Sequence, residues 1–162
     1  YLLEKCKTTD EAISLLKSVP IASQQTLTIA DRTGNIVIVE CNCEGIELIR
    51  PNKDGNFVTT ANEFNSMKMK KFNNYEVDDW KAKERYLLVY NTLKEYKNNY
   101  SFHLVKDILS GKYGFMCQYD RKTDADTVWS VIYDIKNNDI YRVEGNPKKK
   151  EFKKDTRLKF KV

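Results

Sequence analysis

The sequence predicts an α+β fold with a largely antiparallel sheet. Its predicted elements form segregated runs, in which a helix is followed by four strands, two helices and two or three more strands. Segregation of this kind is typical of α+β layers, whereas regular alternation of strands and helices indicates a parallel sheet. The 162 residues, of which 41% are hydrophobic, can bury one substantial core, and no linker divides them. We therefore predict a single domain over residues 1–162.

The first clear helix is predicted to begin at Thr8, which forms a capping box with Glu11 three residues later. Pro20 ends this helix. Between these points, apolar residues recur at helical spacing: Ala12, Ile13, Leu15, Leu16 and Val19. Residues 1–6 have the pattern of the last turns of an earlier helix. Because the chain starts with Tyr1 rather than Met, we expect that an upstream segment was removed.

Four strands joined by glycine-containing turns are predicted next, at residues 26–30, 36–41, 46–49 and 57–61. Residues 36–39 are apolar on both faces, which is typical of a central strand covered by other layers. Glu47 and Arg50 indicate that the following strand is more exposed. Asn62 follows directly after the fourth strand, so we expect a rigid sheet to hold its side chain.

Residues 65–79 are polar and irregular, and we expect a mobile loop on the surface there. Asp78 or Asp79 is predicted to cap a long helix that runs from Trp80 to about Tyr96. This helix separates the first group of strands from the second half of the chain.

A shorter helix is predicted to begin at Ser101 and to end at Gly111. We expect it to bury four apolar residues, Phe102, Val105, Ile108 and Leu109. Residues 127–133 and 140–144 are predicted to pair as a hairpin, and residues 157–162 to return as one more strand.

The formal net charge of +5 arises from basic residues concentrated at the end of the chain. They alternate there with Leu158, Phe160 and Val162, a pattern typical of an edge strand guarded by lysines. No aromatic and basic platform accompanies the charge, so we expect no nucleic-acid partner. No run of about 18 apolar residues is present, so we expect no membrane span. The location is predicted to be cytoplasmic unless the missing upstream segment carries a secretion signal.

The four cysteines, Cys6, Cys41, Cys43 and Cys117, lack the regular spacing of a disulfide scaffold, and reduced thiols are expected. Cys41 and Cys43 are two residues apart on a predicted strand, which would direct both to one face. With the other two cysteines they would make a four-thiolate zinc site. Buried free cysteines are the more common arrangement, so we predict no metal.

Short motifs along nearly the whole chain form one pattern. They are Glu11-Ala12-Ile13, residues 26–31 with Gly34, Val39-Glu40, Ala61-Asn62-Glu63-Phe64, Gly114, Cys117, residues 127–134 and Gly145-Asn146-Pro147. This pattern resembles the later part of the linear amide hydrolases that include choloylglycine hydrolase, penicillin V acylase and the acyl-coenzyme A:6-aminopenicillanate acyltransferases. It is more similar to the acyltransferase branch than to the bile-salt hydrolases.

The resemblance implies an N-terminal-nucleophile fold, an αββα sandwich of antiparallel sheets, of which this chain would be the C-terminal part. In that family a Cys becomes residue 1 of the mature chain, where its thiol attacks the acyl carbon and its α-amine handles the proton. Tyr1 cannot serve in this way. The implied partner is therefore an upstream segment that carries the nucleophilic Cys, and this chain alone is expected to be inactive. No cofactor is implied.

Asn62 stands where the family carries an Asn whose side-chain amide donates to the oxyanion, a task that requires a neutral and rigid donor. Without the resemblance, the residues around Asn62 favour the simpler explanation that it caps a turn after its strand. Arg85 matches the family's Arg in the following helical segment, where the guanidinium would orient the Cys or a substrate carboxylate. The alternative is a solvated helix charge paired with Asp78 or Glu84. Glu63 replaces the family's commoner His, which bears on substrate preference.

A catalytic dyad of Cys117 and His103 would need a third group to orient the imidazole, and the sequence shows none. We therefore expect His103 to be packed or solvated on its helix.

Together these observations predict the C-terminal part of a cysteine-type amide hydrolase or acyltransferase. It would cleave linear, non-peptide C–N bonds through an acyl-enzyme, with Asn62 and Arg85 as its catalytic residues and a small amide or acyl compound as substrate. Homo-oligomerisation is left open. The alternative is a non-catalytic α+β binding or interaction module that uses the basic tail or the loop at residues 65–79.

Overall fold

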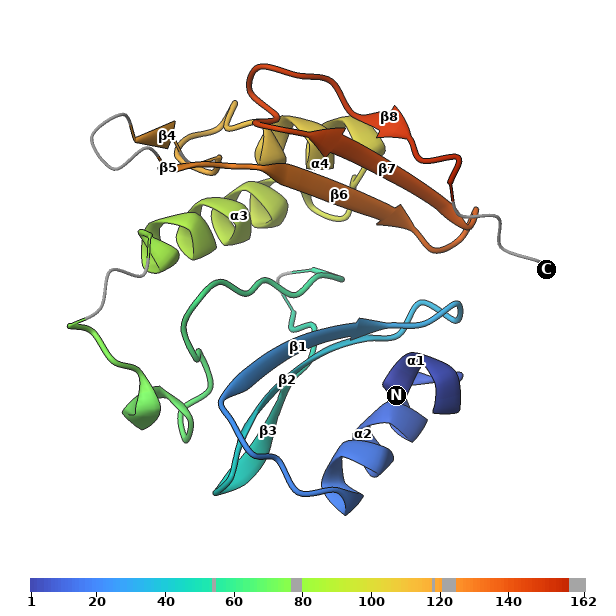
Figure 1. Ribbon diagram of the computed structural model, residues 1–162, viewed down its shortest axis with the longest axis vertical. Helices are drawn as coiled ribbons and strands as arrows, with labels where there is room; N and C mark the ends of the chain where they lie inside the picture. Colours follow the sequence, from blue (N-terminus) through green and yellow to red (C-terminus); the bar gives the residue numbers. More distant parts are fainter. Residues whose placement is uncertain (54, 77–79, 118, 121–124, 158–162) are drawn as a thin grey trace. The chain divides into compact units, whose positions relative to one another are not determined.

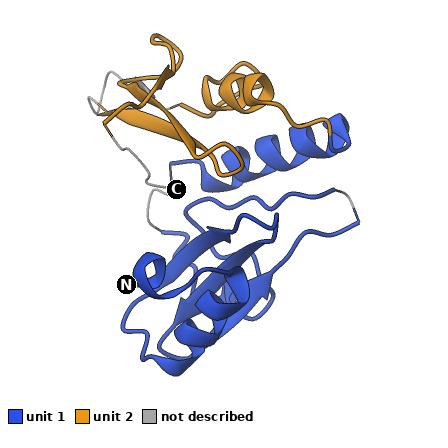
Figure 2. Ribbon diagram, turned by 90° about the vertical axis from the view of Figure 1, so that its right-hand side faces the viewer, with its two compact units in different colours: residues 1–98 blue, residues 99–162 orange. Residues whose placement is uncertain are grey.

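The computed structural model describes residues 1–53, 55–76, 80–117, 119–120 and 125–157. The chain divides into two compact units, residues 1–98 and 99–162 (Figure 2), and each is described by itself. Helices and antiparallel sheets occur in both, so the predicted α+β class is confirmed, and the elements agree with part of an N-terminal-nucleophile fold. The single domain over residues 1–162 stays a prediction, because one domain can contain two such units.

Among its described residues, unit 1 contains four helical segments and one three-stranded sheet, and most of these elements are labelled in Figure 1. Its elements are α1 (Leu2–Lys5), α2 (Thr9–Ser18), β1 (Gln25–Ala30), β2 (Ile36–Asn42), β3 (Gly45–Ile49), the 3₁₀ helix η1 (Lys70–Phe72) and α3 (Ala82–Tyr96). The predicted start and end of α2 are confirmed. The Thr8 hydroxyl accepts from the Glu11 N–H at 3.2 Å, and Val19 is already extended just before Pro20.

The sheet of unit 1 has the order β1-β2-β3 with antiparallel neighbours, so β2 is the central strand, as predicted. In the register, Val39 lies opposite Leu27 of β1 and Leu48 of β3. Val37, Ile38 and Val39 are all fully buried, although consecutive strand residues point to opposite faces. Both faces of β2 are therefore covered.

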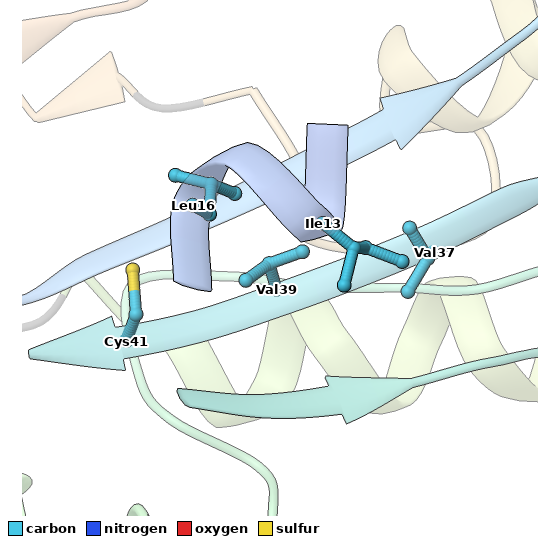
Figure 3. Close-up of a cluster of buried hydrophobic side chains, with 5 residues drawn as sticks. All are labelled: Ile13, Leu16, Val37, Val39 and Cys41. Carbon is cyan, nitrogen blue, oxygen red and sulfur yellow. The ribbon is translucent and has the colours of Figure 1, made fainter. Parts of the chain in front are cut away.

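The core of unit 1 forms where α2 packs on one face of this sheet (Figure 1). Ile13 and Leu16 of the helix contact the alternate strand residues Val37, Val39 and Cys41 (Figure 3). Positions three apart on a helix share a face, and so do positions two apart on a strand. The helical spacing of the apolar residues in α2 and the alternation of residues in β2 therefore explain this contact directly.

The predicted fourth strand at residues 57–61 is wrong, because the structure has no strand there. Phe57 is buried, but its ring packs edge-on against Tyr90 of α3, with ring centroids 5.6 Å apart. A helix rather than a neighbouring strand supplies the burial that the apolar pattern had indicated. Asn62 consequently lies in a bend after an irregular segment, and not at the tip of a strand.

The segment after Asn62 is irregular, as predicted, except for the single turn of η1. It is not a loose surface loop, because Phe64 and Met69 are buried at 5% and 3% exposure. The last part of the predicted loop, residues 77–79, lies outside the described residues. The two proposed helix caps, Asp78 and Asp79, belong to that part.

Unit 2 contains α4 (Phe102–Leu109), β4 (Tyr119–Asp120), β5 (Ala125–Asp126), β6 (Trp129–Asp134), β7 (Asp139–Glu144) and β8 (Lys153–Lys154). The Ser101 hydroxyl caps α4 by accepting from the Leu104 N–H at 3.1 Å, which confirms the predicted start. Of the four residues expected to be buried in α4, only Ile108 is. Phe102 is instead 36% exposed, and its ring centroid lies 4.4 Å from that of Tyr141.

The predicted hairpin is confirmed, since β6 and β7 pair from Trp129 opposite Glu144 to Asp134 opposite Asp139. Strand β8 continues the sheet beyond β7 and presents two exposed lysines at that edge. The strand expected at residues 157–162 lies outside the described residues, except for Arg157, which is not in a strand. Among the helices that the structure describes, none is long and apolar enough to cross a bilayer.

Candidate functional site

The structure brings Asn62 and Arg85 into direct contact, although they are 23 residues apart. The Arg85 Nη2 donates a hydrogen bond of 3.0 Å to the Asn62 side-chain oxygen Oδ1. Asn62 is exposed in its bend, and Arg85 is half-buried in the first turn of α3. The two residues singled out from the sequence thus form one pair.

This contact determines which way the Asn62 amide faces. A guanidinium has only donors, so the amide oxygen must be the atom turned toward Arg85. The amide nitrogen Nδ2 then lies on the other side of the group. Within the described part of the chain, that nitrogen has no hydrogen-bond acceptor, so both of its hydrogens remain for another molecule.

Arg85 is itself held at the start of α3. Its Nε donates to the Trp80 carbonyl oxygen at 3.0 Å. Trp80 and Lys81 have positive φ values of 54° and 58°, a backbone conformation that residues other than glycine adopt rarely. This pair of residues turns the chain into α3 and places a carbonyl beside the guanidinium. One side of Arg85 therefore contacts the main chain while another contacts Asn62.

Asn62 lines a hollow of about 300 Å³ between the start of β1 and the bend. The hollow is lined by Gln24, Gln25, Thr26, Ala61, Asn62, Glu63, Phe64 and Asn73. All of its polar side chains are neutral except Glu63. A small polar group can therefore reach the Asn62 amide from this side, and Glu63 is the residue that would give the hollow a charge.

The segment that follows Asn62 is held through its main chain. Asn73 binds Phe64 twice, because its Oδ1 accepts from the Phe64 N–H at 2.8 Å and its Nδ2 donates to the Phe64 carbonyl at 3.0 Å. The next two N–H groups, of Asn65 and Ser66, donate to the carboxylate of Glu40 at 2.6 and 2.9 Å. Three successive main-chain donors are therefore bound by the side chains of Asn73 and Glu40.

None of the four cysteines is among the residues that line this hollow. Cys41 is fully buried in the core, and burial raises the pKa of its thiol, which disfavours the thiolate needed for attack. His103 is exposed on α4, where its ring contacts Phe102. The expectation that His103 is packed or solvated agrees with this position.

The predicted geometry of a thiolate zinc site is wrong in one respect. Cys41 lies in β2, but Cys43 lies in the turn between β2 and β3 and is exposed, so the two do not share a strand face. The residues that the structure describes contain no group of three or more His, Cys, Asp or Glu side chains placed to hold a metal ion.

Sequence reasoning assigned no role to Glu40, Asn73, Gln24 or Gln25 at this site. For Glu40 a signal was present, because a carboxylate directly after the apolar run of a covered central strand needs buried partners. The other three are ordinary polar residues, and only the folded chain shows that they lie beside Asn62.

The sequence model of the family described as acyl-coenzyme A:6-aminopenicillanic acid acyl-transferase matches residues 1–149 of the chain. No curated protein and no solved structure matches it.

Proposed function

We propose, since this chain belongs to the acyl-coenzyme A:6-aminopenicillanic acid acyl-transferase family, that it supplies the oxyanion-binding part of an enzyme acting on linear acyl compounds. Membership in this family indicates an acyltransferase or amide hydrolase activity. The finer assignment rests on one observation, the 3.0 Å hydrogen bond by which Arg85 turns the Asn62 amide oxygen toward itself. The amide nitrogen is thereby left as a neutral donor beside an open hollow.

The proposed reaction proceeds through an acyl-enzyme. A cysteine thiolate attacks the carbonyl carbon of a linear amide or thioester, and the carbonyl oxygen becomes an oxyanion that accepts a hydrogen bond from Asn62 Nδ2. Collapse of the tetrahedral intermediate breaks the bond to the leaving group. An amide releases its amine, which takes up the proton that the α-amine of the cysteine had accepted from the thiol, and a thioester releases its thiolate. Water or a second amine then attacks the acyl-enzyme and releases the acid or the new amide.

The roles of the two residues follow from their contact. A donor aimed in advance at the developing charge stabilises the transition state without having to reorganise. Asn62 is proposed as that donor, and Arg85 as the residue that prevents its amide from rotating. Because Arg85 contacts the Asn62 oxygen, its charge lies on the side of the amide away from Nδ2, and the donor itself stays neutral.

The nucleophile is proposed to come from outside these 162 residues, on a segment that precedes Tyr1. The positions of the cysteines support this, because none of them lines the hollow with Asn62. On this proposal the chain alone turns over no substrate, and the preceding coding sequence contains a Cys that cleavage can expose as an N-terminal residue.

The test is to express the protein with its preceding coding sequence and to assay it with chromogenic acyl anilides and with acyl-coenzyme A plus an amine. Asn62→Ala should lower kcat by about a hundredfold or more, because loss of one oxyanion donor costs about 3–4 kcal/mol of barrier. Asn56→Ala is the matched control, since Asn56 is an exposed Asn of the same unit that does not line the hollow.

Near-normal turnover of the Asn62→Ala protein would remove this residue from the mechanism. The alternative of a non-catalytic interaction module predicts a different pair of results. It requires that no preceding cysteine can become N-terminal, and that neither substrate class is turned over.

A further inference from the structure

Glu40 is a fully buried carboxylate in the middle of β2, the central strand of unit 1. Its strand neighbours in the register are Thr26 on β1 and Glu47 on β3. A buried carboxylate is costly unless hydrogen-bond donors satisfy it. Among the described residues no Lys or Arg pairs with Glu40, so its charge is satisfied by other groups.

Those groups are two successive main-chain amides. The Asn65 N–H donates to one carboxylate oxygen at 2.6 Å, and the Ser66 N–H donates to the other at 2.9 Å. Hydrogen bonds of main-chain N–H groups to an ionised carboxylate are short and strong. The 2.9 Å bond lies within the usual range of about 2.7–3.2 Å for N–H···O bonds, and the 2.6 Å bond is shorter than that range. The contact joins the covered centre of the sheet to the segment that begins three residues after Asn62.

We propose that Glu40 is a positioning residue for Asn62, an inference that rests on the proposed oxyanion role of that amide. Glu40 holds the chain on the C-terminal side of the bend, and Arg85 holds the Asn62 side chain itself. Asn73 adds a third point of attachment at Phe64. The Asn62 amide is therefore located by a carboxylate that never touches the substrate.

The position explains why a glutamate follows the apolar run at residues 36–39 of this strand. The two oxygens of a carboxylate can each accept from one of two adjacent N–H groups, whereas a Gln side chain has only one acceptor and presents its own N–H groups to the second amide. The support is also rigid, because the neighbouring residues Val39 and Cys41 are fully buried in packed layers.

The first measurement detects the hydrogen bonds between Glu40 and the two main-chain amides, and it needs no substrate. Amide hydrogen exchange by NMR should show faster exchange at Asn65 and Ser66 in Glu40→Ala, by about tenfold or more, as expected when a local hydrogen bond is lost. In Glu40→Gln, which keeps the side-chain volume, one of the two amides should lose its protection. Glu47→Gln is the matched control, because Glu47 lies opposite on β3 and bonds the side chain of Lys68 at 2.8 Å instead.

The second measurement determines the effect on turnover, in protein expressed together with its preceding coding sequence. Glu40→Ala should lower kcat by about ten- to a hundredfold with little change in KM, since a misplacement of about 1 Å can cost about a hundredfold. Glu40→Gln should fall between it and the unaltered protein. Ile38→Val on the same strand controls for lost stability.

A double variant shows whether Glu40 acts through Asn62. When Asn62 is already Ala, adding Glu40→Ala should lower kcat no further, because residues that act as a unit are not additive. A merely structural role would multiply the two losses. Such a multiplied loss, or unchanged exchange at Asn65 and Ser66 in folded Glu40 variants, would overturn the inference.

The two proposals fail in different ways. If Asn62→Ala is slow but Glu40→Ala turns over normally, only the positioning role of Glu40 is overturned. If Asn62→Ala turns over normally, the oxyanion role fails, and the positioning role fails with it.

Discussion

In both units an antiparallel sheet of three strands places one strand between two neighbours, β2 in unit 1 and β7 in unit 2. Strand β2 is buried at every position from Val37 to Asn42, whereas β7 buries only Ile140 and Val143. The strand next to β7 even exposes two aromatic residues, Trp129 at 52% and Tyr133 at 65%. The same topology therefore supports two different degrees of burial.

The difference explains why the candidate site belongs to unit 1. A strand covered on both faces can hold a carboxylate such as Glu40 in a fixed position and use it to bind a neighbouring segment. In unit 2 charged groups pair at the surface, as Arg157 does with Glu144 at 3.7 Å and Lys149 with Asp126 at 3.7 Å. Exposed pairs of this kind contribute little to rigidity.

The largest expected effect is a loss of unfolding free energy, compared for a buried residue of β2 and a buried residue of β7. Ile38→Ala should cost about 2–5 kcal/mol of unfolding free energy, because it leaves a cavity at a fully buried position of β2. Val143→Ala, its counterpart in β7, should cost about 2 kcal/mol, since it removes only two methyl groups. Chemical denaturation measures both values. Amide hydrogen exchange should become faster mainly in β2 for Ile38→Ala and mainly in β7 for Val143→Ala. An equal increase of the exchange rate in both strands for each variant would contradict the comparison of the two sheets.

The next effect concerns the pH dependence of unit 1. Asp31 accepts hydrogen bonds from the hydroxyl and N–H of Thr33 and from the Thr9 N–H, and these bonds hold the pKa of its carboxyl well below the usual range. A lowered folded-state pKa means that the stabilisation is complete above the unfolded pKa of about 4 and is lost as the pH falls below it.

Asp31→Asn should therefore lower the unfolding midpoint at pH 7 by more than a helix-cap variant does. Its difference from the unaltered protein should shrink as the pH falls from about 5 to about 3. Asp126→Asn is the matched variant in unit 2, where Asn146 and the Thr127 N–H lower the pKa of a more exposed carboxyl. Denaturant titrations at several pH values measure both. A difference between Asp31→Asn and the unaltered protein that does not change with pH would contradict the stabilising role of the Asp31 charge.

The smallest effect should be the same in both units. Thr8 and Ser101 each cap a helix by accepting from the N–H three residues later. Replacing either residue by Ala should cost about 1 kcal/mol, because the lost bond is local and does not depend on the burial of the sheet. Thermal or chemical unfolding measures this cost. A much larger loss at one of the two caps would show that its helix is coupled to the surrounding core.

Much of the fold could be predicted because its signals are local. The caps at Thr8 and Ser101, the stop at Pro20 and the β6–β7 hairpin each depend on residues that are close in sequence. The two-sided burial of β2 was also predicted, since its apolar run excludes an exposed face. The error at residues 57–61 arose because Phe57 has the pattern of a strand but packs on a helix.

The candidate site was predicted only in part. Family resemblance singled out Asn62 and Arg85, and the structure shows that they touch. Glu40 and Asn73 were not assigned a role, because their partners lie 25 and 9 residues away along the chain. No period or spacing in the sequence indicates hydrogen bonds over such separations.

The sequence by itself determined where α2 and α4 begin and that β2 is central, since capping and apolar patterning act between near neighbours in the chain. Only the tertiary structure decided that the Asn62 oxygen faces Arg85 and that Glu40 holds the next segment. Those contacts depend on how an irregular segment crosses a packed sheet. Their geometry is therefore a property of the folded chain and not of its local pattern.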